Sequence, residues 1–202
     1  FNNKIFYLPN SPKLKTKKIY KNKKNNLLLF IPKIDDGINL EVIMDSLEIL
    51  KRKKIDIKFL ITGSFSNKNL EFIIRKKVEK RRLKKNMLFL GFIKDNKKII
   101  KLLNNSKIGV TTYNVTDRHN YYKFSDSLKI RQYAEFGLPI LTEGLTPLSK
   151  EVVLNKFGFI FRNSKDLSNK IIKIIFKNQY KHLSKNSKVW ALKNSREKFV
   201  NK

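Results

Sequence analysis

The stretch Phe124-Ser-Asp-Ser-Leu-Lys-Ile-Arg-Gln-Tyr-Ala-Glu-Phe-Gly-Leu-Pro139, which continues into Ile140-Leu-Thr-Glu-Gly144, decides how the rest of the chain is interpreted. Its Ser-Asp-Ser triplet consists of residue types that are favoured at a helix N-cap. Its Gly-Leu-Pro triplet is typical of a helix end that is followed by a new strand. The stretch therefore predicts a polar loop that opens onto a short helix over 128–136, and then a strand.

The start of this helix predicts an anion site. Backbone N–H groups at a helix N-terminus are unpaired and carry partial positive charge, which favours a phosphate. Lys129 falls in the first turn, where a cation opposes the helix dipole by about 0.3–1 kcal/mol unless an anion binds. Gln132 follows three residues later and shares its face. In the alternative interpretation, Lys129 is a solvated lysine offset by Asp126, and Gly137 and Pro139 are purely structural.

Six short apolar segments alternate with segments of helical periodicity, which predicts an α/β fold with one doubly wound parallel sheet of about six strands, Rossmann-like in type. Ligands of such sheets bind outside the carboxyl ends of the strands, where loops 32–37, 91–95 and 114–126 are the candidates. The expected strands are 27–31, 57–62, 87–90, 108–113, 139–142 and 158–161, and the expected helices are 40–50, 70–83, 97–103, 128–136, 151–156, 166–177 and 180–199.

The first 26 residues, rich in Lys and Asn, are interpreted as a linker, and residues 27–202 as one domain. The chain begins at Phe1 without a methionine, which suggests a piece of a longer protein. We expect it to be cytoplasmic, because no apolar run reaches the ~18 residues of a membrane span and no signal peptide is evident.

The chain is strongly basic, with 46 Lys and Arg against 16 Asp and Glu and a net charge of +30. Such a charge favours polyanionic partners, among them anionic lipid and phosphorylated ligands. Lys, Asn and Ile are frequent throughout, however, so a general compositional bias is the competing explanation. We do not expect nucleic acid to be the ligand, because aromatic residues are not interleaved with basic ones as in a stacking platform.

Cysteine is absent and only two histidines occur, so the sequence predicts no disulfide, no thiolate nucleophile and no metal site. His119 and His182 show no ligand spacing. His119 is a candidate for lining a ligand pocket, although an exposed loop histidine is the favoured interpretation.

Taken in order, the motifs resemble those of the C-terminal, donor-binding half of a GT-B-fold glycosyltransferase of the retaining group 1 type. The resemblance covers roughly residues 7 to 200 and is most specific in Ser127-Leu-Lys-Ile-Arg-Gln-Tyr133 with Gly137-Leu-Pro-Ile140. Weaker parts of the resemblance are Leu8-Pro-Asn10, the segment Leu29 to Gly37, Ile61-Thr-Gly63, Phe89-Leu-Gly-Phe92 and the late Trp190.

The resemblance implies a set of site residues for a nucleotide-diphosphate sugar, which is the donor substrate. Positive charge and N–H donors would stabilise the leaving diphosphate, so neither a cofactor nor a metal is expected. By the resemblance, Gly91, Phe92 and Ile93 would hold the base through backbone groups, Ser127, Leu128 and Lys129 would receive the diphosphate, Lys33 would be a second phosphate-binding cation, and Gln132 would face the ribose.

Three positions depart from the family pattern. Gln132 stands where many members have a ribose-binding glutamate, and Phe124 stands where the family has an earlier glutamate. Asp36 occupies a position of the first loop where a lysine is usual, at a cost to phosphate binding. These departures suggest a divergent subfamily or lost activity.

The implied function is transfer of the sugar to an acceptor, which would be a glycan, a lipid-linked molecule or a protein. The N-terminal half that supplies the acceptor site is not in this sequence, so the chain is expected to bind the donor without turning over alone. A peripheral contact with the inner face of the membrane is a secondary expectation. The alternatives are a catalytically degenerate scaffold or interaction domain of the same fold, a GT-B-fold sugar-nucleotide epimerase, and a nucleic-acid binder.

Overall fold

The computed structural model describes residues 26–114 and 122–195. The predicted linker, the Leu8–Asn10 motif and His119 lie outside these ranges. So do the last residues of the helix that was predicted to reach 199.

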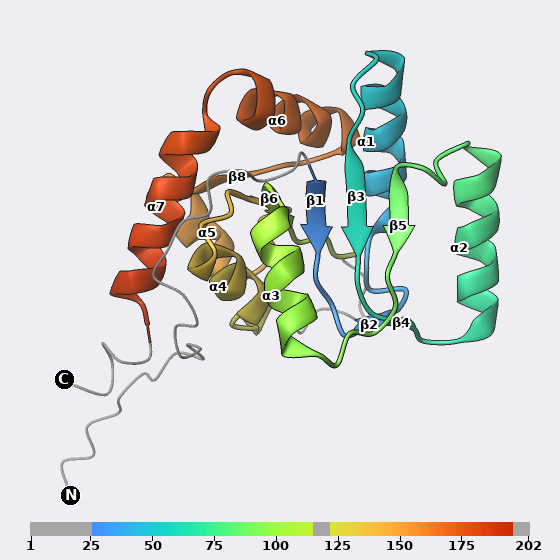
Figure 1. Ribbon diagram of the computed structural model, residues 1–202, viewed down its shortest axis with the longest axis horizontal. Coiled ribbons are helices and arrows are strands. Elements are labelled where there is room, and N and C mark those ends of the chain that lie inside the picture. The colour runs from blue at the N-terminus through green and yellow to red at the C-terminus, as the bar shows by residue number, and fades with distance from the viewer. Residues whose placement is uncertain (1–25, 115–121, 196–202) are drawn as a thin grey trace, which may run out of the picture.

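The described residues form a six-stranded parallel sheet in the order β5-β3-β1-β6-β7-β8 (Figure 1). Its strands are β1 (Asn26–Leu29), β3 (Lys58–Ile61), β5 (Met87–Phe89), β6 (Ile108–Val110), β7 (Ile140–Thr142) and β8 (Gly158–Ile160). Leu28 of β1 pairs with Leu60 on one side and with Gly109 on the other. The chain first builds outward from β1 through β3 to β5 and then returns to β6, so the topological switch point lies between β1 and β6.

Helices cover both faces of the sheet, which gives three layers. The central strands are apolar on both sides, as in parallel sheets generally. Leu27 and Leu29 pack with α1 and α6, whereas Leu28 packs on the opposite face with α3, α4, α5 and α7. The helices are α1 (Leu40–Arg52), α2 (Lys68–Lys80), α3 (Asn96–Asn105), α4 (Leu128–Glu135), α5 (Pro147–Leu154), α6 (Ser164–Phe176) and α7 (Tyr180–Lys193).

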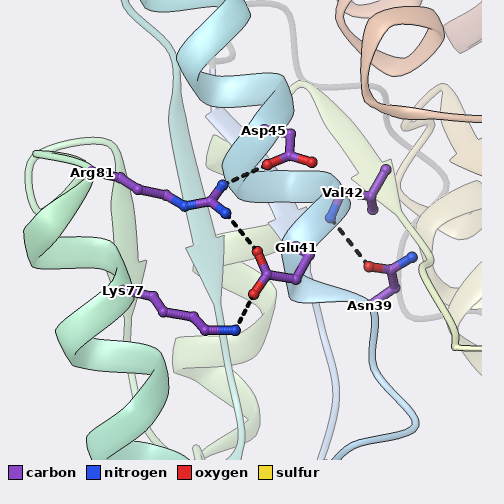
Figure 2. A network of polar contacts seen from close by, with 6 residues as sticks. All are labelled: Asn39, Glu41, Val42, Asp45, Lys77 and Arg81. Carbon is purple, nitrogen blue, oxygen red and sulfur yellow. Dashed lines mark hydrogen bonds and ion pairs between the residues drawn. The ribbon is translucent and has the colours of Figure 1, made fainter.

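Helix α2 lies beyond the edge of the sheet and is joined to α1 by ion pairs (Figures 1 and 2). Arg81, just after α2, contacts Asp45 at 2.5 Å and Glu41 at 2.8 Å, and Lys77 contacts Glu41 at 2.5 Å. Only two residues of α2, Ile74 and Val78, are buried. Because these charges are partly exposed, each pair contributes about 0–1 kcal/mol.

All six predicted strands are present and parallel, which confirms the predicted fold class. The strand predicted over 108–113 ends at Val110. The prediction that α5 begins at Glu151 is wrong, because Thr146 precedes a proline at the first helical position and the helix begins at Pro147. The last helix ends at Lys193 and not at 199.

Two short segments at the carboxyl edge of the sheet were not predicted as strands. Lys33–Ile34 (β2) and Ser64–Phe65 (β4) form a separate parallel pair below the ends of β1 and β3 (Figure 1). This pair fixes the loop that follows β1, which contributes to the candidate site.

Candidate functional site

A cavity of about 570 Å³ lies at the carboxyl ends of β1 and β6, at the topological switch point. Its lining residues come from the segments after β1, β3, β5 and β6 and from the start of α4. They are Phe30, Ile31, Pro32, Lys33, Asp35, Ile38, Thr62, Phe92, Ile93, Tyr113, Tyr122, Ser125, Asp126, Ser127, Leu128, Lys129 and Gln132. All the predicted site residues except Gly91 are therefore brought together in one cavity.

A second cavity, of about 770 Å³, lies between α2 and the edge strand β5. It contains none of the predicted site residues and no helix N-terminus opens onto it. The cavity at the switch point is therefore the better candidate, although it is smaller.

Ser127 is the N-cap residue of α4 and lines the cavity. The residue is 6% exposed, its side chain makes no capping hydrogen bond, and its Oγ has no hydrogen-bond partner among the residues that the structure describes. Leaving a buried polar group without a partner costs about 1–3 kcal/mol. A ligand oxygen at the start of α4 would accept a hydrogen bond from Ser127 Oγ and would meet the partial positive charge of the helix N-terminus.

Lys129 is held against the wall of the cavity. Its ammonium Nζ donates a hydrogen bond to the hydroxyl of Tyr113 at 3.1 Å and lies 4.8 Å from the centre of that ring. Tyr113 is 5% exposed and packs against Tyr122, with 4.4 Å between the ring centres. The aromatic pair, which sequence reasoning missed, therefore places the charge of Lys129 beside the N-terminus of α4.

The first loop contributes one cation and one carboxylate to the cavity. Lys33 lies in β2, and its side chain is exposed. Asp35 lines the cavity and accepts a local hydrogen bond from Gly37 N at 3.1 Å. Asp36, the residue expected to oppose phosphate binding, is not in the lining; its carbonyl oxygen accepts a hydrogen bond from Asn114 Nδ2 at 2.6 Å.

The turn after β5 forms another side of the cavity through Phe92 and Ile93. Gly91 lies outside the lining and shapes the turn. Its backbone has a positive φ of 69°, which glycine adopts without strain, and its carbonyl oxygen accepts a hydrogen bond from Gly63 N at 2.8 Å.

The two positions where the family pattern has glutamates differ in their surroundings. Gln132 is half-buried and lines the cavity. Phe124 is 84% exposed and is not in the lining.

Asp126, in the wall of the cavity, forms a partly buried ion pair with Arg131. Arg131 is 5% exposed and donates two hydrogen bonds to the carboxylate of Asp126, at 2.9 and 3.1 Å. Its guanidinium lies 5.5 Å from the centre of the Trp190 ring on α7. Trp190 thus packs against Arg131 of α4. The Ser-Asp-Ser triplet suggested a cap and gave no sign of this pair.

Tyr133 ties the two strands at the switch point together. Its hydroxyl accepts a hydrogen bond from Phe30 N at 2.7 Å and donates one to the carbonyl oxygen of Val110 at 3.2 Å. The side chain is fully buried, which raises the pKa of Tyr133 well above its usual value. Gly109 leaves room for it, since a Cβ there would lie 2.3 Å from Tyr133 Cγ.

Within the described ranges, no group of three or more His, Cys, Asp or Glu side chains is placed to hold a metal ion. His182 lies on α7 and contacts Asn186. No helix in the same ranges is both long enough and apolar enough to cross a membrane.

A parallel α/β sheet with a cavity at its switch point and a helix N-terminus at the cavity defines a Rossmann-like domain of the kind that binds phosphorylated ligands. The family model described as glycosyl transferases group 1 matches residues 13–190. The chain belongs to this family. A comparison with curated protein sequences finds no match.

Solved structures with the same fold include the C-terminal domain of the group 1 glycosyltransferase LpcC from Francisella tularensis. It shares 17% identity with this chain over 86% of this chain and 87% of that domain, with a TM-score of 0.69. HepE from Anabaena, solved with UDP, shares 13% identity over 89% of this chain and 47% of its own, with a TM-score of 0.71. TarM from S. aureus, in a complex that contains UDP, shares 19% identity over 100% of this chain and 39% of its own, with a TM-score of 0.70.

The chain therefore spans about 39% of TarM and 47% of HepE, and most of the isolated LpcC domain. The TM-scores of 0.69 to 0.71 establish that the fold is shared, and the family match establishes that the chain is a glycosyltransferase domain.

Proposed function

We propose that this chain is the donor-binding half of a retaining glycosyltransferase and that it binds a nucleotide-diphosphate sugar in the cavity at the start of α4. The observation that carries the proposal is the unpartnered, buried hydroxyl of Ser127 at a helix N-terminus, with the ammonium of Lys129 beside it. The UDP bound in the structures of HepE and TarM supports the same ligand class.

In this proposal the diphosphate lies across the start of α4. The hydroxyl of Ser127 and the first amides of the helix, which include that of Leu128, donate hydrogen bonds to the phosphate oxygens. Lys129 and Lys33 balance the negative charge. Donors that are already in place stabilise the charge that develops on a leaving group without a reorganisation cost. The diphosphate can then leave without a metal ion.

The remaining site residues are assigned to the nucleoside. The turn of Gly91, Phe92 and Ile93 would hold the base through its backbone. Gln132 would face the ribose, with the carbonyl oxygen of its amide as acceptor for a hydroxyl group. An amide is a weaker acceptor than the carboxylate usual at this position, so ribose binding would contribute less.

We further propose that the acceptor, a glycan, a lipid-linked molecule or a protein, enters from a second, N-terminal domain of the GT-B fold. The described cavity opens at the carboxyl edge of the sheet, where such a half would face it. The enzyme would work in the cytoplasm. A peripheral contact with the inner face of the membrane would suit a lipid-linked acceptor.

Binding is tested by titrating the purified chain with UDP, GDP and ADP and their sugars in a thermal-shift assay. A ligand at 100 times its dissociation constant stabilises a protein by about 2.7 kcal/mol. We expect one nucleotide to raise the melting temperature and Lys129→Ala to reduce that shift to about half or less. A chain that no nucleotide stabilises would instead be a scaffold domain, the alternative that the departures at Gln132 and Asp36 favour.

A further inference from the structure

Glu143 lies just beyond β7, next to the cavity but outside its lining. Its carboxyl group contacts the end of β6 at two points. Oε1 lies 2.8 Å from Oγ1 of Thr112, and Oε2 accepts a hydrogen bond from the backbone N–H of Tyr113. No motif singled out this residue, and the proposed donor site does not use it.

The contacts of Thr112 determine where the protons are. The same hydroxyl oxygen, Oγ1, lies 2.8 Å from the carbonyl oxygen of Asn39. A hydroxyl carries one proton, and a carbonyl oxygen carries none. Both contacts are hydrogen bonds only if Thr112 donates to Asn39 and accepts from Glu143 Oε1. Glu143 then carries a proton and is a neutral acid.

If Glu143 is ionised, its Oε1 becomes a second acceptor that competes for the single proton of Thr112. One of the two contacts is then between two oxygen atoms with no proton between them. Thr112 is 1% exposed, so no bulk water replaces the lost bond. A buried acceptor without a donor costs free energy, and the bond from Thr112 to Asn39 becomes the weaker of the two because a carboxylate is the stronger acceptor.

These residues connect two walls of the cavity. Asn39 ends the first loop and caps α1, with its Oδ1 accepting from Val42 N at 3.1 Å (Figure 2). Tyr113 holds the ammonium of Lys129. We propose that Glu143 is a positioning residue that, as a neutral acid, joins the loop at Asn39 to the end of β6 and so holds Tyr113 and Lys129 in place for the ligand. Its effect on ligand binding rests on the donor site proposed above.

The electrostatic surroundings agree with the geometry. Burial raises the pKa of Glu143 to about 7, although the contacts with Thr112 and with the backbone N–H of Tyr113 also suit the ionised form and offset part of this effect. The ionisable groups on the neighbouring segments are Asp35 and Asp36 before α1, Tyr113 after β6, Lys129 on α4 and Arg162 after β8. Glu143 would therefore change its charge near neutral pH.

The first experiment follows thermal unfolding of the wild type and Glu143→Gln between pH 5 and 8.5. An amide reproduces the neutral acid, because its NH₂ donates to Thr112 and its oxygen accepts from Tyr113 N. A carboxyl group with a raised folded pKa loses its stabilising contribution as pH rises from its unfolded value, near 4.5, to about 7. We expect the variant to become more stable than the wild type over this range, by several degrees of melting temperature, and the difference to stay constant above pH 7.

Parallel melting curves of the two proteins at every pH would overturn the proposal. The same comparison in a Thr112→Val background, which lacks the hydroxyl, should show a smaller difference between Glu and Gln. If Glu143→Gln is as damaging as Glu143→Leu, the residue acts by packing and not by its hydrogen bonds, and the proposal is also overturned.

The second experiment measures the dissociation constant of UDP by calorimetry at pH 6 and pH 8. If only the form with neutral Glu143 binds UDP, the apparent affinity is proportional to the fraction of the protein in that form. At one pH unit above the pKa, the affinity is then about tenfold lower. The affinity of Glu143→Gln should not fall in this way. Any effect of the titration of UDP itself is the same for both proteins and cancels in the comparison. If the affinity for UDP depends on pH equally in both proteins, the charge of Glu143 has no effect on the cavity. No UDP binding at any pH would overturn the donor site, while the unfolding comparison still decides the role of Glu143.

Discussion

The ammonium of Lys129 is anchored on Tyr113, 3.1 Å from its hydroxyl oxygen and 4.8 Å from the centre of its ring. Tyr113 is almost fully buried and stacks on Tyr122, so the cation has a defined position at the cavity wall. A lysine that is already ordered loses less side-chain entropy when a ligand binds. This arrangement favours a role in binding over that of a solvated surface lysine.

The first prediction concerns Lys129→Ala. A hydrogen bond that involves a charged group contributes about 1.5–3 kcal/mol, so we expect the variant to bind UDP about 10- to 100-fold more weakly. Calorimetry at fixed salt measures this change. Lys84→Ala is the matched control, because it removes the same charge at a different place. Lys84 lines the other cavity and pairs with Glu79. Equal losses in both variants would point to the net charge of the chain and not to the site.

The second prediction separates stability from binding at Ser127. Its Oγ has no partner within the described part of the chain, so Ser127→Ala should leave the free energy of unfolding unchanged or raise it slightly. The same variant should bind UDP more weakly, by about 1 kcal/mol, since the ligand loses a donor. Chemical denaturation and calorimetry measure the two quantities.

Ser184→Ala is the control for Ser127. Ser184 is also buried, but its Oγ donates to the carbonyl oxygen of Gly137 at 2.6 Å. Its removal should destabilise the protein by about 1 kcal/mol and leave the UDP affinity unchanged. A Ser127→Ala variant that behaves like this control would show that the hydroxyl has no role at the ligand.

The third prediction concerns Gln132→Glu. A carboxylate accepts hydrogen bonds from hydroxyl groups more strongly than an amide oxygen does, so the substitution should tighten UDP binding by about 1 kcal/mol. The gain should disappear with 2′,3′-dideoxy-UDP, which lacks the ribose hydroxyls. Calorimetry with both ligands tests this directly. A gain that persists with the dideoxy ligand, or a loss with both, would remove Gln132 from the ribose contact.

Much of the fold could be predicted because its strands are short apolar runs. Leu27, Leu28 and Leu29 are buried on alternating faces, and such a run signals a strand with helices on both sides. The strand pair β2 and β4 escaped prediction because each strand has only two residues, which is too short for any periodicity. The predicted start of α5 was wrong because Thr146 is the N-cap residue of this helix and Pro147 stands at its first position.

Some residues of the candidate site could likewise be predicted from the sequence, and others could not. Ser127, Lys129 and Gln132 could be predicted because helix-start chemistry is local in sequence. Contacts between distant segments could not: Tyr113 meets Lys129 across 16 residues, and Glu143 meets Thr112 across 31. Such contacts depend on which strand ends become neighbours, which the sheet order determines. The turn after β5 shows a further limit of prediction from sequence. The turn itself was predicted, but the sequence did not indicate that Phe92 lines the cavity and Gly91 does not.

The last prediction concerns Asp126, a carboxylate in the wall of a cavity proposed to hold a diphosphate. Arg131 neutralises it through two hydrogen bonds while lying buried beside Trp190. Arg131→Met should destabilise the protein by about 1.5–3 kcal/mol, because it removes the two charge-assisted hydrogen bonds that Asp126 accepts from Arg131. It should also weaken UDP binding, since a carboxylate that Arg131 no longer neutralises repels phosphate. Denaturation and calorimetry on the same samples give both values.

The double variant Asp126→Asn with Arg131→Met separates the two effects. Removing both charges at once leaves no uncompensated ion, so much of the stability lost in the Arg131→Met variant should return. Affinity for UDP should return as well, because the repulsive carboxylate is gone. If stability returns and affinity does not, Arg131 positions the start of α4 through its contact with Trp190, and neutralising Asp126 is not what makes the cavity suitable for an anion.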